Sequence, residues 1–256
     1  MVLFISCISL LLVLLVVYMS IEAKRTIVID HQVTFANFPE TFGSLRVFFI
    51  SDIHQRTITD RLLHKVKEPV DFVVIGGDLT EKGVPLSRVL HNIKQLKKLG
   101  PVYFVWGNND YEVDYHELDA LLLSENVVIL DNTAVKLESD QGEHIHLLGV
   151  DDTSKKRADL SLALQDCDED GFKMLISHNP SIIHKVKEED QIDFILSGHT
   201  HGGQIRFFGL GPYELGGFKE MKGTKLFVSN GYGTTALPLR LGARAETHYL
   251  VISRTK

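Results

Sequence analysis

The chain has two patterns of apolar and polar positions: one long apolar run at its start, and alternating short apolar and polar stretches after it. The first run, Val2 to Ile21, is continuously apolar and contains neither a charged residue nor a proline. From about Thr26 onward, short apolar runs are separated by polar stretches, which is typical of strands buried on both faces. The predicted strands of this kind are 45–51, 71–77, 102–107, 173–177 and 193–198.

The polar stretches between these runs predict helices and half-buried strands. Residues 85–100 place leucine, valine and isoleucine on one helical stripe and end in Gly100–Pro101, which stops a helix. Residues 114–125 can form a second helix. Strands are predicted over 25–35, 224–233 and 246–253, with an antiparallel pair over 127–139 and 142–152. With neither an internal repeat nor a long linker, the pattern predicts one α/β domain with a thick β core.

The opening apolar run is long enough to cross a membrane. As a helix it would span about 30 Å, the thickness of a bilayer's hydrocarbon core. A cleaved signal peptide is disfavoured, because no basic residue precedes the run and no small-residue cleavage site follows it. We expect a retained transmembrane anchor over 1–22, single-pass in the cell membrane, and a folded domain over 26–256. Lys24 and Arg25 favour a cytoplasmic domain, but a long folded domain can override so small a bias, so the sequence leaves the side of the membrane open.

Composition and charge narrow the classes of function. The 256 residues are 44% hydrophobic and 23% charged, which suits a globular core. The net charge is −6 and no basic block stands out, so we expect no role as a nucleic-acid scaffold. The two cysteines, Cys7 in the apolar run and Cys167 in an acidic stretch, cannot form a disulfide framework. The neighbouring carboxylates also disfavour a reactive thiolate at Cys167.

Polar side chains of a particular kind follow five of the predicted strands. Ligand sites of α/β sheets lie outside the carboxyl ends of the strands, so we expect these side chains to meet in one site. In chain order they are Asp52 and His54, then Asp78, then Asn108, Asn109 and Asp110, then His178, then His199 and His201. Nearby glycines, among them Gly198, Gly202 and Gly203, would permit positive φ angles and leave room for a bound phosphate.

Asp52, Asp78, Asn108 and the four histidines in this group form a set of seven metal donors. Carboxylate, amide and imidazole ligands suit Mn, Fe, Zn or Ni rather than Ca or Cu(I). Seven ligands are too many for one ion, but they suffice for two if one aspartate bridges. Two ions about 3.5–4 Å apart form a clamp for phosphoryl groups and lower the pKa of bound water from 15.7 toward about 7. The sequence therefore predicts two divalent metal ions as cofactors and a phosphorylated substrate.

In order and spacing, these segments resemble the motifs of the calcineurin-like metallophosphoesterase superfamily. They read SDIH, GGDLT, GNND, SHNP and GHTHGGQ, and the resemblance extends from about Leu45 to Gly203. The last motif and the N-terminal apolar segment further resemble a bacterial membrane-associated branch, in which some members hydrolyse phosphodiester or pyrophosphate bonds of envelope lipids. The resemblance implies a four-layer αββα sandwich of the metallophosphoesterase type over 26–256, preceded by an N-terminal transmembrane helix.

The resemblance also implies a role for each candidate ligand. The first metal would be held by Asp52, His54 and His201, the second by Asn108, His178 and His199, and the bridge between them would be Asp78. A metal-bridging hydroxide would attack phosphorus in line, and the ions and nearby dipoles would neutralise the developing charge.

One position departs from the family pattern. Asn109 stands where the family usually has a histidine that contacts the substrate phosphate and, in some members, protonates the leaving group. Asparagine can donate a hydrogen bond but cannot act as a general acid near pH 7. Either the substrate carries a good leaving group, or another group, such as His54 or a metal-bound water, supplies the proton.

These inferences predict a dinuclear metal-dependent phosphoric ester hydrolase. Its substrate would be a phosphomonoester, phosphodiester or pyrophosphate, on a phosphorylated small molecule or a membrane lipid. The alternative is a catalytically impaired metal-binding or scaffold protein of the same fold, in which Asn109 marks lost chemistry. Hydrolysis of amide bonds is disfavoured, because the histidines and aspartates follow the phosphoesterase order.

The remaining polar and aromatic positions carry weaker signals. We expect His144 and His146 to lie on a solvated strand face, and the charged residues from 151 to 157 to form a solvated loop. Surface positions are predicted for His31, His64, His91, His116, His184 and His248. Asp110 could orient a ligand or simply occupy a turn. Residues 206–223 could form a substrate-side or membrane-facing loop, or a hairpin packed on the core.

Overall fold

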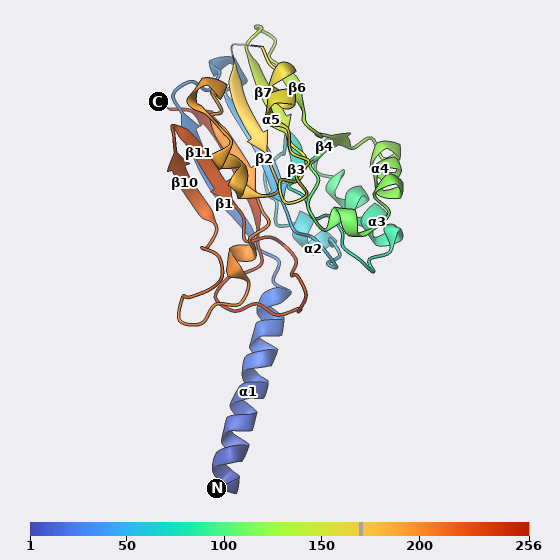
Figure 1. Ribbon diagram of the computed structural model, residues 1–256, viewed down its shortest axis with the longest axis vertical. Coiled ribbons are helices and arrows are strands. Elements are labelled where there is room, and N and C mark those ends of the chain that lie inside the picture. The colour runs from blue at the N-terminus through green and yellow to red at the C-terminus, as the bar shows by residue number, and fades with distance from the viewer. Residues whose placement is uncertain (169–170, 256) are drawn as a thin grey trace.

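Two mixed sheets of six strands each lie at the centre of the computed structural model, which describes residues 1–168 and 171–255 (Figure 1). In spatial order the first sheet contains β1 (Val28–Phe35), β12 (Thr247–Arg254), β2 (Ser44–Ile50), β3 (Phe72–Ile75), β4 (Val102–Phe104) and β5 (Val128–Ile129). The second contains β10 (Gly217–Met221), β11 (Thr224–Val228), β9 (Phe194–Ser197), β8 (Phe172–Ile176), β7 (His144–Gly149) and β6 (Thr133–Glu138).

Parallel pairing aligns the carboxyl ends of several strands within each sheet. In the first sheet β2, β3, β4 and β5 run parallel, and in the second β7, β8, β9 and β11 do so. The antiparallel pairs lie at β12 with β2, at β6 with β7 and at β10 with β11. Each sheet therefore presents the carboxyl ends of four strands at one edge.

Helices cover the outer faces of both sheets. The first sheet packs against α2 (Asp60–Leu63), α3 (Leu86–Leu96) and α4 (Tyr115–Ser124), and the second against α5 (Leu160–Gln165) and η3 (Pro180–His184). The remaining 3-10 turns are η1 (Glu40–Phe42), η2 (Asp110–Glu112), η4 (Glu188–Asp190) and η5 (His201–Gly203). The order of helices, sheet, sheet and helices confirms the predicted four-layer αββα sandwich.

The core between the sheets is apolar and rich in aromatic side chains. Phe49 from β2 and Phe172 from β8 are fully buried there, together with Met174 and Leu250. Burying each such side chain contributes about 1.5–3 kcal/mol, so this layer holds the two sheets together. On the outside, α3 buries Val89, Ile93 and Leu96, which recur at the helical spacing that the sequence predicted.

The predicted antiparallel pair over 127–139 and 142–152 is confirmed only in part. β6 pairs antiparallel with β7, as expected, but β5 belongs to the other sheet and runs parallel to β4. The chain crosses between the sheets around Leu130, which is fully buried in the core between them. Asn132 makes the turn with φ of 52°, a conformation that asparagine tolerates better than most residues.

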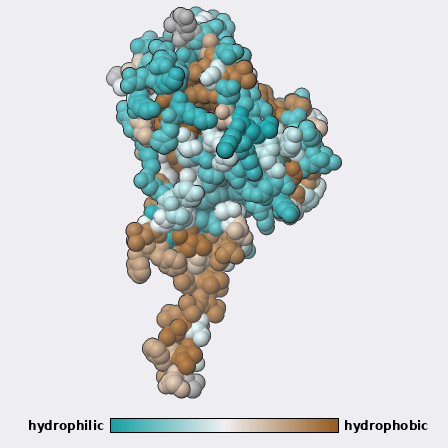
Figure 2. All heavy atoms as spheres, in the orientation of Figure 1, coloured by the Kyte–Doolittle hydropathy of each residue, from teal (hydrophilic) through white to brown (hydrophobic). Residues whose placement is uncertain are grey.

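The helix α1 (Val2–Ala23) extends away from the domain (Figure 1). Its segment from Leu3 to Ala23 is long and apolar enough to cross a membrane. The side chains along most of its length are exposed, and they form the brown stalk of Figure 2. A helix that is apolar on all sides and unpacked is expected in lipid rather than in water.

Candidate metal centre

The predicted ligands converge between the carboxyl ends of strands from both sheets. Asp52 and His54 follow β2, Asp78 follows β3 and Asn108 follows β4. From the second sheet, His178 follows β8, and His199 and His201 follow β9. The fully or almost fully buried members are Asp52, His54, Asp78, His178 and His201. Histidine and aspartate are seldom buried together unless they are paired or bind a metal.

Asp52, His54 and His201 form one compact group, in which one donor atom of each residue lies within 4.8 Å of the others. The Nε2 atoms of His54 and His201 are 3.1 Å apart, and Nε2 of His201 lies 3.4 Å from Oδ1 of Asp52. A carboxylate and two imidazoles facing one point are a set that could hold a transition-metal ion.

A second group joins Asp52, Asp78 and His178 within the same limit of 4.8 Å. Nε2 of His178 lies 3.2 Å from Oδ2 of Asp78 and 3.2 Å from Nδ1 of His199. The same Oδ2 atom lies 3.7 Å from Nε2 of His54. Asp52 belongs to both groups, and one oxygen of Asp78 lies between a histidine of the first group and a histidine of the second.

Asn108 contributes a buried oxygen that is open to a ligand. Its Oδ1 atom has no hydrogen-bond partner among the described residues. Its amide nitrogen donates to Oδ1 of Asn109 at 2.7 Å, which fixes the orientation of the side chain. A buried acceptor without a partner is costly, and a metal ion would satisfy it.

The backbone at the centre is strained at the candidate ligands themselves. Positive φ angles occur at Asp52 (55°), His54 (51°), Asp78 (51°), His199 (72°) and His201 (51°). Such angles cost about 1–3 kcal/mol at a non-glycine residue and persist only where surrounding structure imposes them. Concentration of this strain on five candidate ligands is typical of a functional site.

Of the glycines predicted to have positive φ angles, Gly202 (58°) and Gly203 (80°) do so, but Gly198 does not. Gly198 is not at positive φ; a Cβ atom there would lie 2.5 Å from Oδ2 of Asp52. At Gly107, a Cβ would lie 2.3 Å from Oδ1 of Asp78. The expectation that Gly198 provides a positive φ is therefore wrong. Gly198 and Gly107 leave room for the carboxylate of a candidate ligand, which packs directly against the backbone.

Asp110 orients the loops that carry the centre. Its buried carboxylate accepts hydrogen bonds from the backbone N–H groups of Asp78 (2.9 Å), Thr80 (3.0 Å) and Gly107 (2.9 Å). Burial raises the pKa of Asp110 to about 7, although the bonds from Gly107 and Thr80 act in the opposite direction. Of the two roles that the sequence left open, the structure supports the orienting one.

The electrostatics of the centre favour cations. Burial acts to lower the pKa of His178, but the adjacent Asp78 carboxylate outweighs it and raises the pKa to about 10. Burial also acts to raise the pKa of Asp78, yet His178 and His54 hold it far below its usual range. Burial lowers the pKa of His201 to about 3, against the attraction of Asp52. The ionised carboxylate of Asp78 thus lies in a buried site beside His178, where a metal ion could take the place of the proton on the imidazole.

Two further residues support the candidate ligands, and the sequence reasoning missed both. Oε2 of Glu81 lies 2.9 Å from Nδ1 of His54, which leaves Nε2 of that ring facing the centre. Arg240 is fully buried and its guanidinium lies 3.1 Å from Nδ1 of His201. It also donates to the carbonyl oxygens of Asn230 (2.6 Å) and Gly233 (2.7 Å). The only sequence signal for Glu81 is its place three residues after Asp78.

The centre opens into a cleft of about 250 Å³. Asp78, Asn108, Asn109 and His199 line one part of it. Asn109 is half-buried, and its amide nitrogen donates to Oε1 of Glu112 at 3.0 Å. His54, by contrast, is fully buried and does not line the cleft.

Several expectations of solvated surface are wrong. His146 is fully buried on β7, and with His144 and Asp168 it forms a third group whose donor atoms lie within 4.8 Å of one another. This group lies at the amino ends of β7 and β8, the opposite edge from the centre. Asp168 is engaged there by Lys136, whose Nζ lies 2.8 Å away.

Asp151, Asp152 and His248 are also buried instead of solvated. Asp151 accepts hydrogen bonds from the Tyr111 hydroxyl at 2.6 Å and from Nε of Arg157 at 2.5 Å, so its charge is compensated. Nε2 of His248 lies 2.8 Å from Oγ of Ser229. The burial of Asp151 and His248 thus depends on Tyr111 and Ser229, which are distant from them in sequence.

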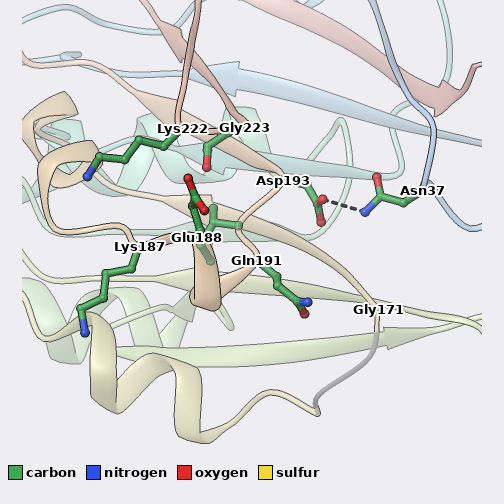
Figure 3. Close-up of a pocket in the computed structure, with 10 residues that line it drawn as sticks. Asn37, Gly171, Lys187, Glu188, Gln191, Asp193, Lys222 and Gly223 are labelled. Atoms are coloured by element: carbon green, nitrogen blue, oxygen red, sulfur yellow. Dashed lines mark hydrogen bonds between the residues drawn. The ribbon is translucent and has the colours of Figure 1, made fainter.

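A separate polar cavity of about 370 Å³ lies away from the centre (Figure 3). Gly171, Asp193 and Thr224 line it, and they stand at the amino ends of β8, β9 and β11. Asn37 closes one side by donating a hydrogen bond to Asp193 at 2.7 Å. This cavity is therefore at the opposite edge of the second sheet from His178 and His199.

Fold and site together define a class: an αββα sandwich with carboxylates and imidazoles clustered at the strand ends, as in metal-dependent phosphoesterases. The model of the calcineurin-like phosphoesterase family matches residues 45–203, and the chain belongs to this family. The sequence resemblance is thereby confirmed over the segment that carried it.

Two relatives extend the comparison beyond the matched segment. The chain is 48% identical over 210 residues to the uncharacterised protein YpbG of Bacillus subtilis, covering 81% of each chain. It is 32% identical over 267 residues to a transmembrane protein with metallophosphoesterase domain from Bos taurus. That alignment covers 94% of this chain and 60% of the relative, so the bovine protein has a large additional part.

Among solved structures, the sulfate thiohydrolase SoxB of Thermus thermophilus is similar with a TM-score of 0.53 and 15% identity. The match covers 82% of this chain and 56% of that chain. At this identity the similarity concerns the fold alone, and it agrees with the four layers described above.

Proposed function

We propose that this protein is a membrane-anchored, dinuclear metal-dependent phosphoric ester hydrolase. The observation that carries the proposal is the position of Asp78. Its Oδ2 atom lies 3.7 Å from His54 in one group and 3.2 Å from His178 in the other. A carboxylate shared in this way is what a pair of bridged cations requires.

The residues present fit two ions. Asn108 offers an unpartnered oxygen, and the carboxylates and imidazoles suit Mn, Fe, Zn or Ni. The proposed ligands are Asp52, His54 and His201 for the first ion, Asn108, His178 and His199 for the second, and Asp78 for both. When bound, the ions would supply Lewis acidity toward a phosphoryl group and activation of water.

The chain's own groups would position the reaction. The backbone N–H of Asn109 donates to Oδ1 of Asp78 at 2.8 Å, which holds the shared carboxylate in place. The Asn109 side chain lies in the cleft, where its amide can donate to a phosphate oxygen. Of the proton sources considered for the leaving group, His54 is disfavoured because it is buried behind Asp78 and Glu81. A substrate with a good leaving group, or a proton from water in the cleft, fits this geometry.

The membrane enters the proposal through α1. The helix is long and apolar enough to span a bilayer, and the bovine relative is described as a transmembrane protein. An anchored domain would meet phosphorylated molecules close to a membrane surface. The proposed substrates are therefore phosphoesters or pyrophosphates of small molecules or lipids, with a cell-membrane location.

The full-length chain in detergent should hydrolyse bis(p-nitrophenyl) phosphate when Mn²⁺ is added, and should lose this activity in a chelator. Release of p-nitrophenol measures the rate, and elemental analysis of the same sample measures bound metal. Two bound ions without turnover on a broad panel of phosphoesters would support the scaffold alternative instead.

Replacing Asn109→His should extend activity to esters with poor leaving groups, because imidazole can protonate a departing alkoxide. General acid catalysis contributes roughly 10²–10⁴-fold, so we expect a gain of up to about 100-fold on alkyl phosphodiesters. Little change is expected on p-nitrophenyl esters, whose leaving group needs no proton. Asn109→Gln is the matched control, since it keeps an amide without an acid. Equal rates for the histidine and glutamine variants on alkyl esters would contradict this account of the position.

A further inference from the structure

Exposed apolar side chains gather where α1 meets the domain. Phe207 (55% exposed), Phe208 (fully exposed) and Leu210 (78%) lie in the loop between η5 and β10, and Leu237 (57%) lies in the loop between β11 and β12. We call these four residues the apolar lip. Figure 1 shows the two loops, in orange and red, beside the end of α1, and Figure 2 shows a brown surface there that is continuous with the helix. Large apolar patches of this kind mark interaction surfaces.

The end of α1 is fixed to the domain beside this lip. Met19 and Ala23 are buried, and the backbone N–H of Arg240 donates to the carbonyl oxygen of Met19 at 3.0 Å. Glu22 is also buried and pairs with Arg25, whose Nε lies 2.7 Å from Oε1. Because α1 is fixed to the domain, a bilayer spanned by α1 has a defined orientation relative to the domain. The lip lies near the last turns of the helix.

The loop that carries the lip is held in one shape. Its Arg206 guanidinium donates to the carbonyl oxygens of Gly202 (3.0 Å), Gly209 and Tyr213. The Arg206 backbone N–H donates to the carbonyl oxygen of Leu241 at 2.7 Å, which ties this loop to the other one. Gly202 directly follows His201, so the same loop links the lip to the candidate metal centre.

The cleft opens between the centre and these loops. Opposite Asp78 and Asn109 it is lined by Pro212 and Tyr213 from the first loop and by Thr235 from the second. A neighbouring groove of about 490 Å³ shares His199 and Tyr213 with the cleft. The groove is lined in part by apolar side chains, namely Ile183, Leu215, Met221, Leu226 and Val228.

We propose that the apolar lip enters the boundary between headgroups and acyl chains of the bilayer that α1 spans, so that the cleft faces the membrane surface. Apolar side chains at such a boundary penetrate by about 5–10 Å. Basic residues flank the lip at the level expected for headgroups: Lys24 is exposed, and the Arg244 side chain is 67% exposed. They would favour anionic lipids. The choice of a bilayer as the partner rests on the membrane-spanning role of α1 in the proposed function.

The test places a tryptophan in the lip of the full-length protein. Phe208→Trp is reconstituted in phosphatidylcholine–phosphatidylglycerol nanodiscs, with ordinary or brominated acyl chains. The fluorescence of the tryptophan at position 208 should be blue-shifted in both kinds of nanodisc. In nanodiscs with brominated acyl chains most of this fluorescence should be quenched. The matched control is Leu162→Trp on α5, which is exposed but distant from α1 in Figure 1 and should not be quenched. The native Trp106 is buried in the domain and gives the same background in both variants.

Three outcomes would overturn the proposal. If bromine quenches Phe208→Trp no more than Leu162→Trp, the lip lies no deeper in the bilayer than a residue distant from α1. Red-shifted emission from Phe208→Trp would place the lip in water. A blue shift without quenching by bromine would place the residue against protein, such as a second copy of the chain. Because quenching requires no turnover, it is independent of the hydrolase activity. The control for α1 itself is co-flotation of the protein with liposomes, which fails if the helix does not insert.

Discussion

Replacing Asp78→Asn should reduce the rate of phosphoester hydrolysis by about 1,000-fold or more, since several kcal/mol of metal assistance corresponds to such a factor. The substitution removes the negative charge that lies between His54 and His178. An amide oxygen can still accept the hydrogen bond that the N–H of Asn109 donates to Oδ1 of Asp78, so the loop geometry is retained. We therefore expect a folded protein that holds at most one ion.

Elemental analysis measures the number of ions bound to Asp78→Asn, and turnover of bis(p-nitrophenyl) phosphate measures its rate of hydrolysis. The matched control is Asp140→Asn, at an exposed position outside the centre, which should leave both unchanged. Retention of two ions and a normal rate in Asp78→Asn would refute the bridging role. Loss of rate with two ions retained would indicate that Asp78 acts on the substrate instead.

The sequence was sufficient to bring the candidate ligands to one place. Each of them follows a strand, and parallel strands align their carboxyl ends within each sheet. His178 and Asp78 follow strands of different sheets, so their contact also requires the two sheets to pack with these edges together. Periodicity likewise located α3 and the buried strands. These successes rest on local patterns, together with one general rule of sheet topology.

The sequence was not sufficient where a side chain's surroundings come from distant segments. Glu81 and Arg240 resemble ordinary surface charges in the sequence, and only the fold places them at His54 and His201. His146 alternates like a solvated position, but it is buried within the second sheet. Gly198 was linked to backbone freedom, whereas its effect is steric, through contact with Asp52.

The apolar lip is another segment whose surroundings the sequence alone could not predict. The aromatic, glycine-rich run 206–223 fits both a core hairpin and an exposed loop by composition. Its second half contains the edge strand β10, which pairs with β11 just beyond the run, while Phe207, Phe208 and Leu210 in its first half are exposed. Arg206 decides between the two, because its bonds to three carbonyl oxygens close the loop on itself and turn Phe207 and Phe208 outward.

Replacing Glu81→Gln should weaken the binding of one metal ion without abolishing the chemistry. The Glu81 carboxylate lies 2.9 Å from Nδ1 of His54 and also accepts a hydrogen bond from Gln55. Carboxylates in this position fix the orientation of a ligating imidazole and increase its basicity, and their removal costs about 10–100-fold in metal affinity or activity. Glutamine keeps the shape and one acceptor but removes the charge, so the change should act through His54.

The measurement is turnover as a function of free Mn²⁺ at fixed substrate. We expect the half-saturating Mn²⁺ concentration to rise by about 10–100-fold, while the rate at saturating metal stays within a few-fold of the parent value. Glu125→Gln is the matched control, because Glu125 pairs with Lys97 on the surface and should leave the titration unchanged. If excess Mn²⁺ fails to restore the rate of the Glu81 variant, the residue acts on the reaction rather than on the ion.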